Sequence, residues 1–363
     1  MEEMKKVPLF SDHQRLGAQM ALFGGWVMPI QYEGILSESK WCRESASLFD
    51  ISHMGEFYFK GDVEASGLER LFSCDIAKIP VGRGRYGFLL NDAGGIVDDL
   101  IIFRLSCDEF MIVVNAATTE KDFQVILSGL HGDSIFTDIS AATAKLDLQG
   151  PKSREVLAEL FGESIRQCPY FGFSKMDLFG SEALVSRTGY TGELGYEIYL
   201  KSDSVAECWR RLLQDERVKP AGLGARDILR LEMGYSLYGS DIDESTTPLE
   251  AGLGQFVDLS RDFVGRDALL GQQQQGLARI RVAFRVNSRR SPRHDYQIFR
   301  AGARVGHVTS GVFSPILGCG IGVGFVSPEA ALPGLSLEIR HETTSMAATV
   351  VRLPFYTEGS LRD

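Results

Sequence analysis

A change in the spacing of apolar residues divides the chain near residue 278. From Arg279 to Val286 apolar and polar residues alternate, and further short runs follow, punctuated by Gly and Pro. Successive side chains of a strand point to opposite faces, so this spacing predicts half-buried strands. The low-complexity run from Gly271 to Gly276, which is rich in glutamine, is typical of a linker or a helix end. We therefore expect a small all-β unit, a barrel or a sandwich, over residues 278–363, after a different region over residues 1–270.

The preceding region mixes the two kinds of secondary structure. Glu109–Val114 has the composition of a strand, and the segment Thr118–Leu127 predicts a helix with Thr118 as its N-cap. Ser202–Asp215 carries apolar residues at helical spacing, which predicts a helix with one face in the core. An α+β class is therefore expected for the chain as a whole.

Composition excludes several functional classes. The 363 residues are 44% hydrophobic, enough for a large core, and the net charge of −10 comes without a cluster of Lys and Arg. We therefore expect no nucleic-acid partner. The start is polar and the apolar stretch Met20–Ile30 is short and interrupted, so neither a signal peptide nor a membrane span is expected. Six scattered cysteines favour a reducing cytoplasm, and the scattered histidines and cysteines predict no metal site.

The segment Gly94–Arg104 places two acids in an apolar strand. A glycine pair at the start predicts a turn. In the strand that follows, Asp99 and Ile101 share one face, whereas Asp98 and Leu100 share the other. Both faces are apolar, so at least one carboxylate points into an apolar environment and needs a partner or a ligand. The pattern alone leaves a structural role at the turn as open as a functional one.

Two further segments carry charged residues in regular patterns. Arg187–Leu200 predicts a strand end, a glycine-rich turn and a second strand, on which Glu197 lies opposite Tyr196; a hairpin with one polar face explains it equally well. In Gly222–Gly234 the helical spacing puts Arg226 and Arg230 one turn apart. Such a pair suits a carboxylate ligand, but internal salt bridges, for example to Asp227 or Glu232, explain it as well.

In sequence order, many stretches resemble the glycine cleavage T-protein family. They extend over nearly the whole chain, from about residue 7 to Tyr356, and together they are specific to that family. The matching stretches are Phe23–Tyr32, Phe49–Met54, Gly94–Leu100, Leu148–Pro151, Arg187–Glu197, Gly222–Glu232, Tyr238–Gly254 and Val308–Pro315. Asp147 departs from the pattern, because small apolar residues are usual at its position.

The resemblance implies a fold and a reaction. The expected fold is α+β, a ring of three domains with two interwoven lobes, one of them over roughly residues 50–140, and a C-terminal antiparallel β-barrel. The expected reaction is aminomethyl transfer in the glycine cleavage system. A lipoyl group on the partner H-protein carries the aminomethyl group, tetrahydrofolate accepts the methylene carbon, and the products are 5,10-methylenetetrahydrofolate, ammonia and dihydrolipoyl H-protein.

The resemblance also implies roles for individual residues. Asp99 is expected to be the catalytic acid beside the reacting nitrogens of folate, with Asp98 as its structural partner. Glu197 is expected to accept hydrogen bonds from the pterin, and Arg226 to meet the glutamate end of folate. The other expected folate contacts are the backbone of Val113, the neighbouring Asn115, and the walls formed by Met54, Tyr86 and Tyr190.

Two other functions remain open on sequence grounds. The first is a related tetrahydrofolate-dependent demethylase, which the retained acid pair permits although the chain has no flavin domain. The second is a non-enzymatic folate-binding paralogue that assists iron–sulfur assembly; the Lys-Gly-Cys-Tyr type of motif found in such proteins is absent here. Release of ammonia from aminomethylated H-protein distinguishes aminomethyl transfer from both of these functions.

Overall fold

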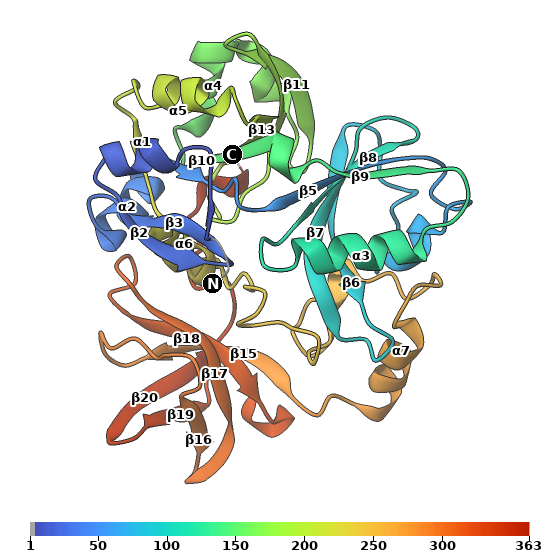
Figure 1. Ribbon diagram of the computed structural model, residues 1–363. Coiled ribbons are helices and arrows are strands. Elements are labelled where there is room, and N and C mark those ends of the chain that lie inside the picture. Colours follow the sequence, from blue (N-terminus) through green and yellow to red (C-terminus); the bar gives the residue numbers. More distant parts are fainter. Residues whose placement is uncertain (1–3, 363) are drawn as a thin grey trace.

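The computed structural model describes residues 4–362, and in it three bodies surround a common centre (Figure 1). The first body contains a six-stranded sheet and a small three-stranded sheet, the second a five-stranded sheet, and the third a closed barrel. The α+β class and the antiparallel barrel expected from the sequence are confirmed. No helix within residues 4–362 is both long and apolar enough to cross a membrane.

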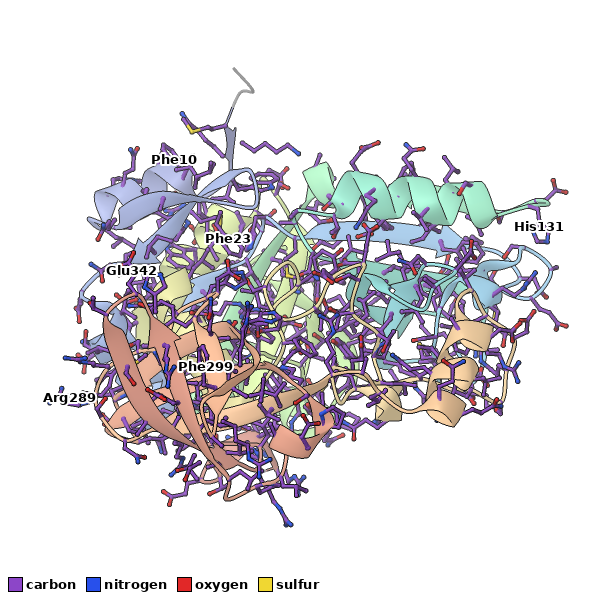
Figure 2. The ribbon with its side chains drawn as sticks, turned by 90° about the horizontal axis from the view of Figure 1, so that it is seen from below. Phe10, Phe23, His131, Arg289, Phe299 and Glu342 are labelled. Atoms are coloured by element: carbon purple, nitrogen blue, oxygen red, sulfur yellow. The ribbon has the colours of Figure 1, made fainter. Side chains whose placement is uncertain are left out.

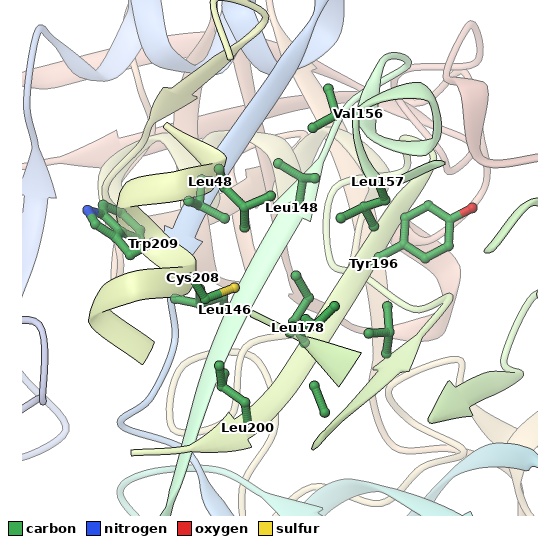
Figure 3. Close-up of a cluster of buried hydrophobic side chains, with 14 of the residues drawn as sticks. Leu48, Leu146, Leu148, Val156, Leu157, Leu178, Tyr196, Leu200, Cys208 and Trp209 are labelled. Atoms are coloured by element: carbon green, nitrogen blue, oxygen red, sulfur yellow. The ribbon is translucent and has the colours of Figure 1, made fainter. Parts of the chain in front are cut away.

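The six-stranded sheet forms the first body. Its order is β11 (Phe173–Leu178), β12 (Ser181–Ser186), β13 (Gly195–Lys201), β10 (Thr143–Gln149), β4 (Ala46–Asp50) and β14 (Val218–Pro220). Two helices cover one face, namely α4 (Ser153–Phe161) and α5 (Val205–Leu212). Trp209 of α5 and Leu146 and Leu148 of β10 meet in the core between them (Figure 3). The helical stripe expected near residues 202–215 is therefore confirmed, and β10 turns its other face away from this core.

The five-stranded sheet of the second body lies between β4 and β10 in the sequence. Its order is β6 (Arg83–Leu90), β7 (Ile96–Arg104), β8 (Glu109–Val114), β5 (Gly55–Lys60) and β9 (Ile135–Asp138). Because the chain leaves the first sheet after β4 and returns to it at β10, the two lobes are interwoven, as expected.

Helix α3 (Thr119–Gly129) packs on the five-stranded sheet, where its Ile126 joins Phe57 and Ile112 in one core. Figure 2 shows α3 along one side of the molecule, with His131 just beyond its C-terminal end. The expected cap is wrong in one respect. Thr118 occupies the N-cap position, but its hydroxyl donates to the backbone oxygen of Asn115 and so caps no helical N–H.

A small sheet and three more helices complete the N-terminal two thirds. The sheet has the order β1 (Lys5–Lys6), β3 (Trp26–Gln31) and β2 (Gln19–Phe23). The helices are α1 (Phe10–Arg15), α2 (Ile35–Glu44) and α6 (Leu223–Met233). Gly234 ends α6 and adopts φ 73°, a left-handed conformation that glycine adopts without steric cost. Short 3-10 helices lie at Leu68–Leu71, Ser140–Ala142, Glu163–Gln167, Gly254–Phe256, Pro328–Ala330 and Ser360–Arg362.

The barrel closes the molecule at its C-terminal side. Its strands run in the order β15 (Ile280–Val286), β18 (Cys319–Val326), β17 (Ala303–Ser314), β16 (Gln297–Arg300), β19 (Ser336–His341) and β20 (Thr344–Val351). Because β15 also pairs with β20, the sheet has no free edge. The glutamine-rich run ends α7 (Arg266–Gln275), one of the two readings expected for it.

Candidate active site

Asp99 lies within strand β7, not in the turn that precedes it. Its carboxylate accepts two hydrogen bonds, one from the hydroxyl of Tyr86 to Oδ2 at 2.8 Å and one from Nδ2 of Asn115 to Oδ1 at 2.9 Å. On the same face, Phe103 contacts Tyr199 of the six-stranded sheet, and Ile101 packs against the cluster that contains both. Burial and the negative charge of Asp98 raise the pKa of Asp99 to about 7, against the lowering effect of the two donors. The carboxyl group can therefore gain or lose a proton near neutral pH.

Asp98 points to the opposite face, toward helix α3. Its carboxylate accepts hydrogen bonds from the backbone N–H and the side-chain amide of Asn115, both at 2.9 Å. Asp122 of α3 is fully buried beside it, and burial and the charge of Asp98 raise the pKa of Asp122 to about 10. A neutral Asp122 thus stands behind Asp98, and Asp98 in turn holds the amide that contacts Asp99.

Glu197 forms a second acidic centre on strand β13. Its Oε1 lies 3.1 Å from Nζ of Lys145, and its Oε2 accepts hydrogen bonds from Thr188 at 2.5 Å and from Tyr199 at 3.3 Å. Burial acts to raise the pKa of Glu197, but the charges of Lys145 and Arg226 and the bond from Thr188 leave the pKa below its ordinary value. Glu197 is therefore a buried carboxylate that stays ionised.

Arg226 on α6 is paired within the protein, but with neither of the acids, Asp227 and Glu232, that were named as examples from the sequence. It donates to the fully buried Asp147 of β10. The salt-bridge reading is right for Arg230, which binds Asp227 at 2.8 Å and Asp241 at 2.6 Å. Asp227 and Glu232 are thus wrong as partners of Arg226, because the partner comes from a strand distant in sequence.

Tyr190 connects the two acidic centres. The guanidinium of Arg226 lies 4.9 Å from the centre of the Tyr190 ring, and the ring stacks on Tyr235 at 5.6 Å. The Tyr190 hydroxyl donates a hydrogen bond to the backbone oxygen of Ser236. Burial raises the pKa of Tyr190, and the negative charge of Asp99 adds to this increase. Tyr190 therefore packs against Arg226 and lies near enough to Asp99 for the charge of Asp99 to act on its hydroxyl.

Met54 and Val113 join the two centres on another side. The sulfur of Met54 lies 3.5 Å from Nζ of Lys145, and Met54 packs against the cluster that contains Val113 and Tyr199. In the ladder Val113 lies opposite Ile101 on one side and Glu56 on the other. Its side chain is buried, so any contact with a ligand falls to its backbone.

The structure thus brings all eight candidate residues into one continuous group. Glu197 and Val113 are buried, and the other six are half-buried. Lys145, Asp122 and Thr188, which contact or flank the two acids, were not predicted from the sequence. The alternation of Lys145, Asp147 and Gln149 with leucines was the available signal, but a solvated strand face gives the same pattern.

Two surface pockets lie elsewhere, at the barrel. One of about 360 Å³ is lined in part by Arg290 and Met346, and one of about 230 Å³ in part by Lys40 and Arg289. No candidate residue lines either of them. Within residues 4–362, no group of three or more His, Cys, Asp or Glu side chains is placed to hold a metal ion.

Comparison with known proteins supplies the family. The family model described as "GCVT N-terminal domain" matches residues 9–261, and "Glycine cleavage T-protein C-terminal barrel domain" matches residues 279–357. An aminomethyltransferase of Halothermothrix orenii is 43% identical over 356 residues, which cover 97% of this chain and 100% of that relative. An aminomethyltransferase of Thermotoga petrophila is 44% identical over 364 residues and 99% of each chain.

A solved structure agrees with these relatives. The glycine cleavage system aminomethyltransferase T of Bartonella henselae superposes with a TM-score of 0.93 and 34% identity, over 98% of this chain and 99% of that one. Both regions of the chain, their relative arrangement and nearly the full length are therefore shared. This chain belongs to the glycine cleavage T-protein family of aminomethyltransferases.

Proposed function

We propose that the chain transfers the methylene carbon of an aminomethyl group, carried by the lipoyl arm of H-protein, to tetrahydrofolate. Two bonds form, from the carbon to N5 and to N10, and two break, from the carbon to nitrogen and to sulfur. N5 and N10 each lose one proton, and the leaving amine and thiol each gain one. The products are 5,10-methylenetetrahydrofolate, ammonia and dihydrolipoyl H-protein. The single observation that carries the proposal is a half-buried Asp99 whose pKa lies at about 7 inside a family of aminomethyltransferases.

Asp99 is assigned the catalytic role. Formation of an iminium group at N5 places positive charge beside the pterin, and a fixed carboxylate stabilises that charge without reorganisation. Tyr86 and Asn115 already hold one hydrogen bond on each oxygen of Asp99, so its orientation is set before the substrate arrives. Asp98, which binds the Asn115 amide, supports this geometry from the other face.

Glu197 is assigned to the N–H groups of the pterin. An ionised carboxylate accepts about four hydrogen bonds, two at each oxygen. Thr188 and Tyr199 occupy Oε2 and Lys145 occupies one position at Oε1. The position that remains on Oε1 is the one we assign to the ligand, so a second parallel bond would require Thr188 or Tyr199 to give way.

Met54, Tyr190 and the backbone of Val113 are proposed to form the walls of the folate site. Arg226 is proposed to meet the glutamate end of folate. Arg226 is paired with Asp147, which lies directly opposite Glu197 in the β10–β13 ladder. Binding of the folate carboxylate by Arg226 would therefore exchange one carboxylate partner for another.

The partner and the compartment follow from the same proposal. The lipoylated H-protein is the expected carrier, and the six cysteines, all unpaired, are consistent with a reducing cytoplasm. We propose no nucleic-acid or membrane partner.

The proposal is tested by supplying the alternative donors side by side. Aminomethylated H-protein with tetrahydrofolate should yield ammonia and 5,10-methylenetetrahydrofolate in equal amounts, whereas methylated amines such as sarcosine should yield neither. Turnover of the methylated amine instead would favour the demethylase reading. Binding of tetrahydrofolate without turnover of either donor would favour the non-enzymatic paralogue.

A further inference from the structure

Lys145 is a fully buried lysine that faces the acid assigned to the pterin. Its side chain is 1% exposed and that of Glu197 is 5% exposed. Strand β10 puts Leu146 and Leu148 into the core, so Lys145 and Asp147 share the opposite face with Glu197 of the adjoining strand. A lysine at this depth is rare unless a counterion balances its charge.

Glu197 is the single ion-pair partner of Lys145 among the residues that the structure describes. The ammonium lies 3.1 Å from Glu197 Oε1, 3.5 Å from the sulfur of Met54 and 4.9 Å from the centre of the Tyr199 ring. The sulfur and the ring provide weak, uncharged contacts. The ammonium and the carboxylate therefore neutralise each other, and each fixes the position of the other.

The other charged groups near Glu197 have partners or act more weakly. Asp147, opposite Glu197 in the ladder, is paired with Arg226, which leaves Lys145 as the nearest cation on Glu197. Glu56 is buried with no donor on Oε1, and burial raises its pKa to about 8 despite the charge of Lys145, so it is mostly neutral at pH 7. Six titratable or charged groups interact electrostatically with Glu197. They are Lys145 and Asp147 of β10, Tyr199 of β13, Arg226 of α6, Glu56 of β5 and Tyr170 of the loop before β11.

We propose that Lys145 is a positioning residue for folate binding: its ammonium keeps the Glu197 carboxylate ionised and fixes Oε1 as an acceptor for the N–H groups of the pterin. The inference rests on the proposed function, because it takes Glu197 as the acid that meets the pterin. A protonated carboxyl group loses acceptor capacity and presents a proton to the donors of the ligand. Burial raises the pKa of Glu197, and the charge of Lys145 opposes this increase. Without Lys145, the pKa of Glu197 would therefore rise toward neutral pH.

The test is the pH dependence of tetrahydrofolate binding in Lys145→Met, measured by anaerobic calorimetry. The quantity compared is the ratio of the variant's Kd to the wild-type Kd, because titration of Asp99 affects both proteins and cancels in the ratio. The ratio should rise by about tenfold between about pH 8.5 and about pH 6. Lys145→Arg, which keeps the charge, should give a ratio that does not change with pH. A flat ratio in Lys145→Met overturns the proposal.

Matched variants separate the charge of Lys145 from its packing and from the proposed function. Lys175→Met removes an exposed lysine from β11 of the same sheet and should bind as wild type does. Glu197→Gln that binds as tightly as wild type would refute the assignment of Glu197 itself. Loss of binding in Glu197→Gln together with a flat ratio in Lys145→Met would refute the role of Lys145 alone.

A second variant covers the case in which Lys145→Met does not fold. Lys145→Met alone leaves the buried Glu197 carboxylate without a counterion, which destabilises the fold. The double variant Lys145→Met/Glu197→Gln removes both charges, so we expect it to fold. Failure of the double variant to fold as well would show that Lys145 is needed for packing, and it would overturn the proposal.

Discussion

The hydroxyl of Tyr86 donates a hydrogen bond of 2.8 Å to Oδ2 of Asp99. The Tyr86 ring is itself fixed by edge contacts with Phe88 and Phe256. Tyr86 was expected from the family resemblance to form part of a wall of the folate site. Its hydrogen bond adds another role, because it stabilises the ionised form of the proposed catalytic carboxylate.

Tyr86→Phe should move the acid limb of the pH–rate profile upward. In the wild type, activity should rise with pH through about 7 as Asp99 loses its proton. Removal of the donor raises the pKa of Asp99 further, so the limb should shift by about 0.5–1 pH unit to higher pH. Initial rates of 5,10-methylenetetrahydrofolate formation between about pH 5.5 and about pH 9 measure this. Tyr58→Phe, which removes a hydroxyl bonded to Glu109 at 2.7 Å, is the control. An equal shift in both variants would argue against the assigned contact.

Asp147→Ala should destabilise the fold by leaving Arg226 without its partner. Arg226 is 14% exposed and Asp147 is fully buried, and the loss of one member of such a pair costs about 3 kcal/mol in the free energy of unfolding. Asp227→Ala on α6 should cost less than about 1 kcal/mol, because Asp227 is 42% exposed and Arg230 keeps Asp241. Urea unfolding at neutral pH compares the two. Similar losses in both variants would show that the Asp147–Arg226 pair has no special weight.

Asp122→Asn should stabilise the protein increasingly as the pH rises. The folded state keeps Asp122 protonated up to about pH 10, whereas the unfolded chain ionises this carboxyl group near its ordinary pKa. The wild type therefore loses stability with rising pH across that window, and a neutral asparagine does not. The stability gap should be small near pH 4 and grow by up to about 1.4 kcal/mol per pH unit above it.

Urea unfolding at two pH values, one acidic and one alkaline, measures the Asp122 gap. Glu120→Gln, an exposed position in the first turn of the same helix, should show no such trend. A gap in Asp122→Asn that is the same at both pH values would mean that Asp122 is ionised in the folded protein.

Local patterns predicted the elements that carry the site, because each depends on neighbouring residues. Alternation placed Asp98 and Asp99 on opposite faces of one strand, and the structure has Asp99 beside Tyr86 and Asp98 beside Asp122. The period-two signal after residue 278 predicted an all-β unit, a barrel or a sandwich, and the family resemblance implied the closed barrel that the structure has. The division of the chain into regions 1–270 and 278–363 remains a prediction of domain boundaries.

The partners of the charged residues could not be predicted, because they come from strands and helices far apart in the sequence. Arg226 and Asp147 are 79 residues apart, and the pairing depends on how the tertiary fold brings α6 and β10 together. Lys145 shows the same limit. Its position on a polar strand face is readable, but whether that face meets water or a buried carboxylate is decided by tertiary packing. The roles assigned to the eight folate-site residues stay proposals.

The turnover of aminomethylated H-protein by Asp99→Asn is the sharpest test of the proposed catalytic role of Asp99. Asparagine keeps the shape of the side chain and an oxygen for Tyr86, but it cannot carry the negative charge. We expect the rate of 5,10-methylenetetrahydrofolate formation to fall by at least about a hundredfold, while the Kd for tetrahydrofolate changes by less than about threefold. Turnover at the wild-type rate in a variant that binds tetrahydrofolate normally would contradict the role of the Asp99 carboxylate.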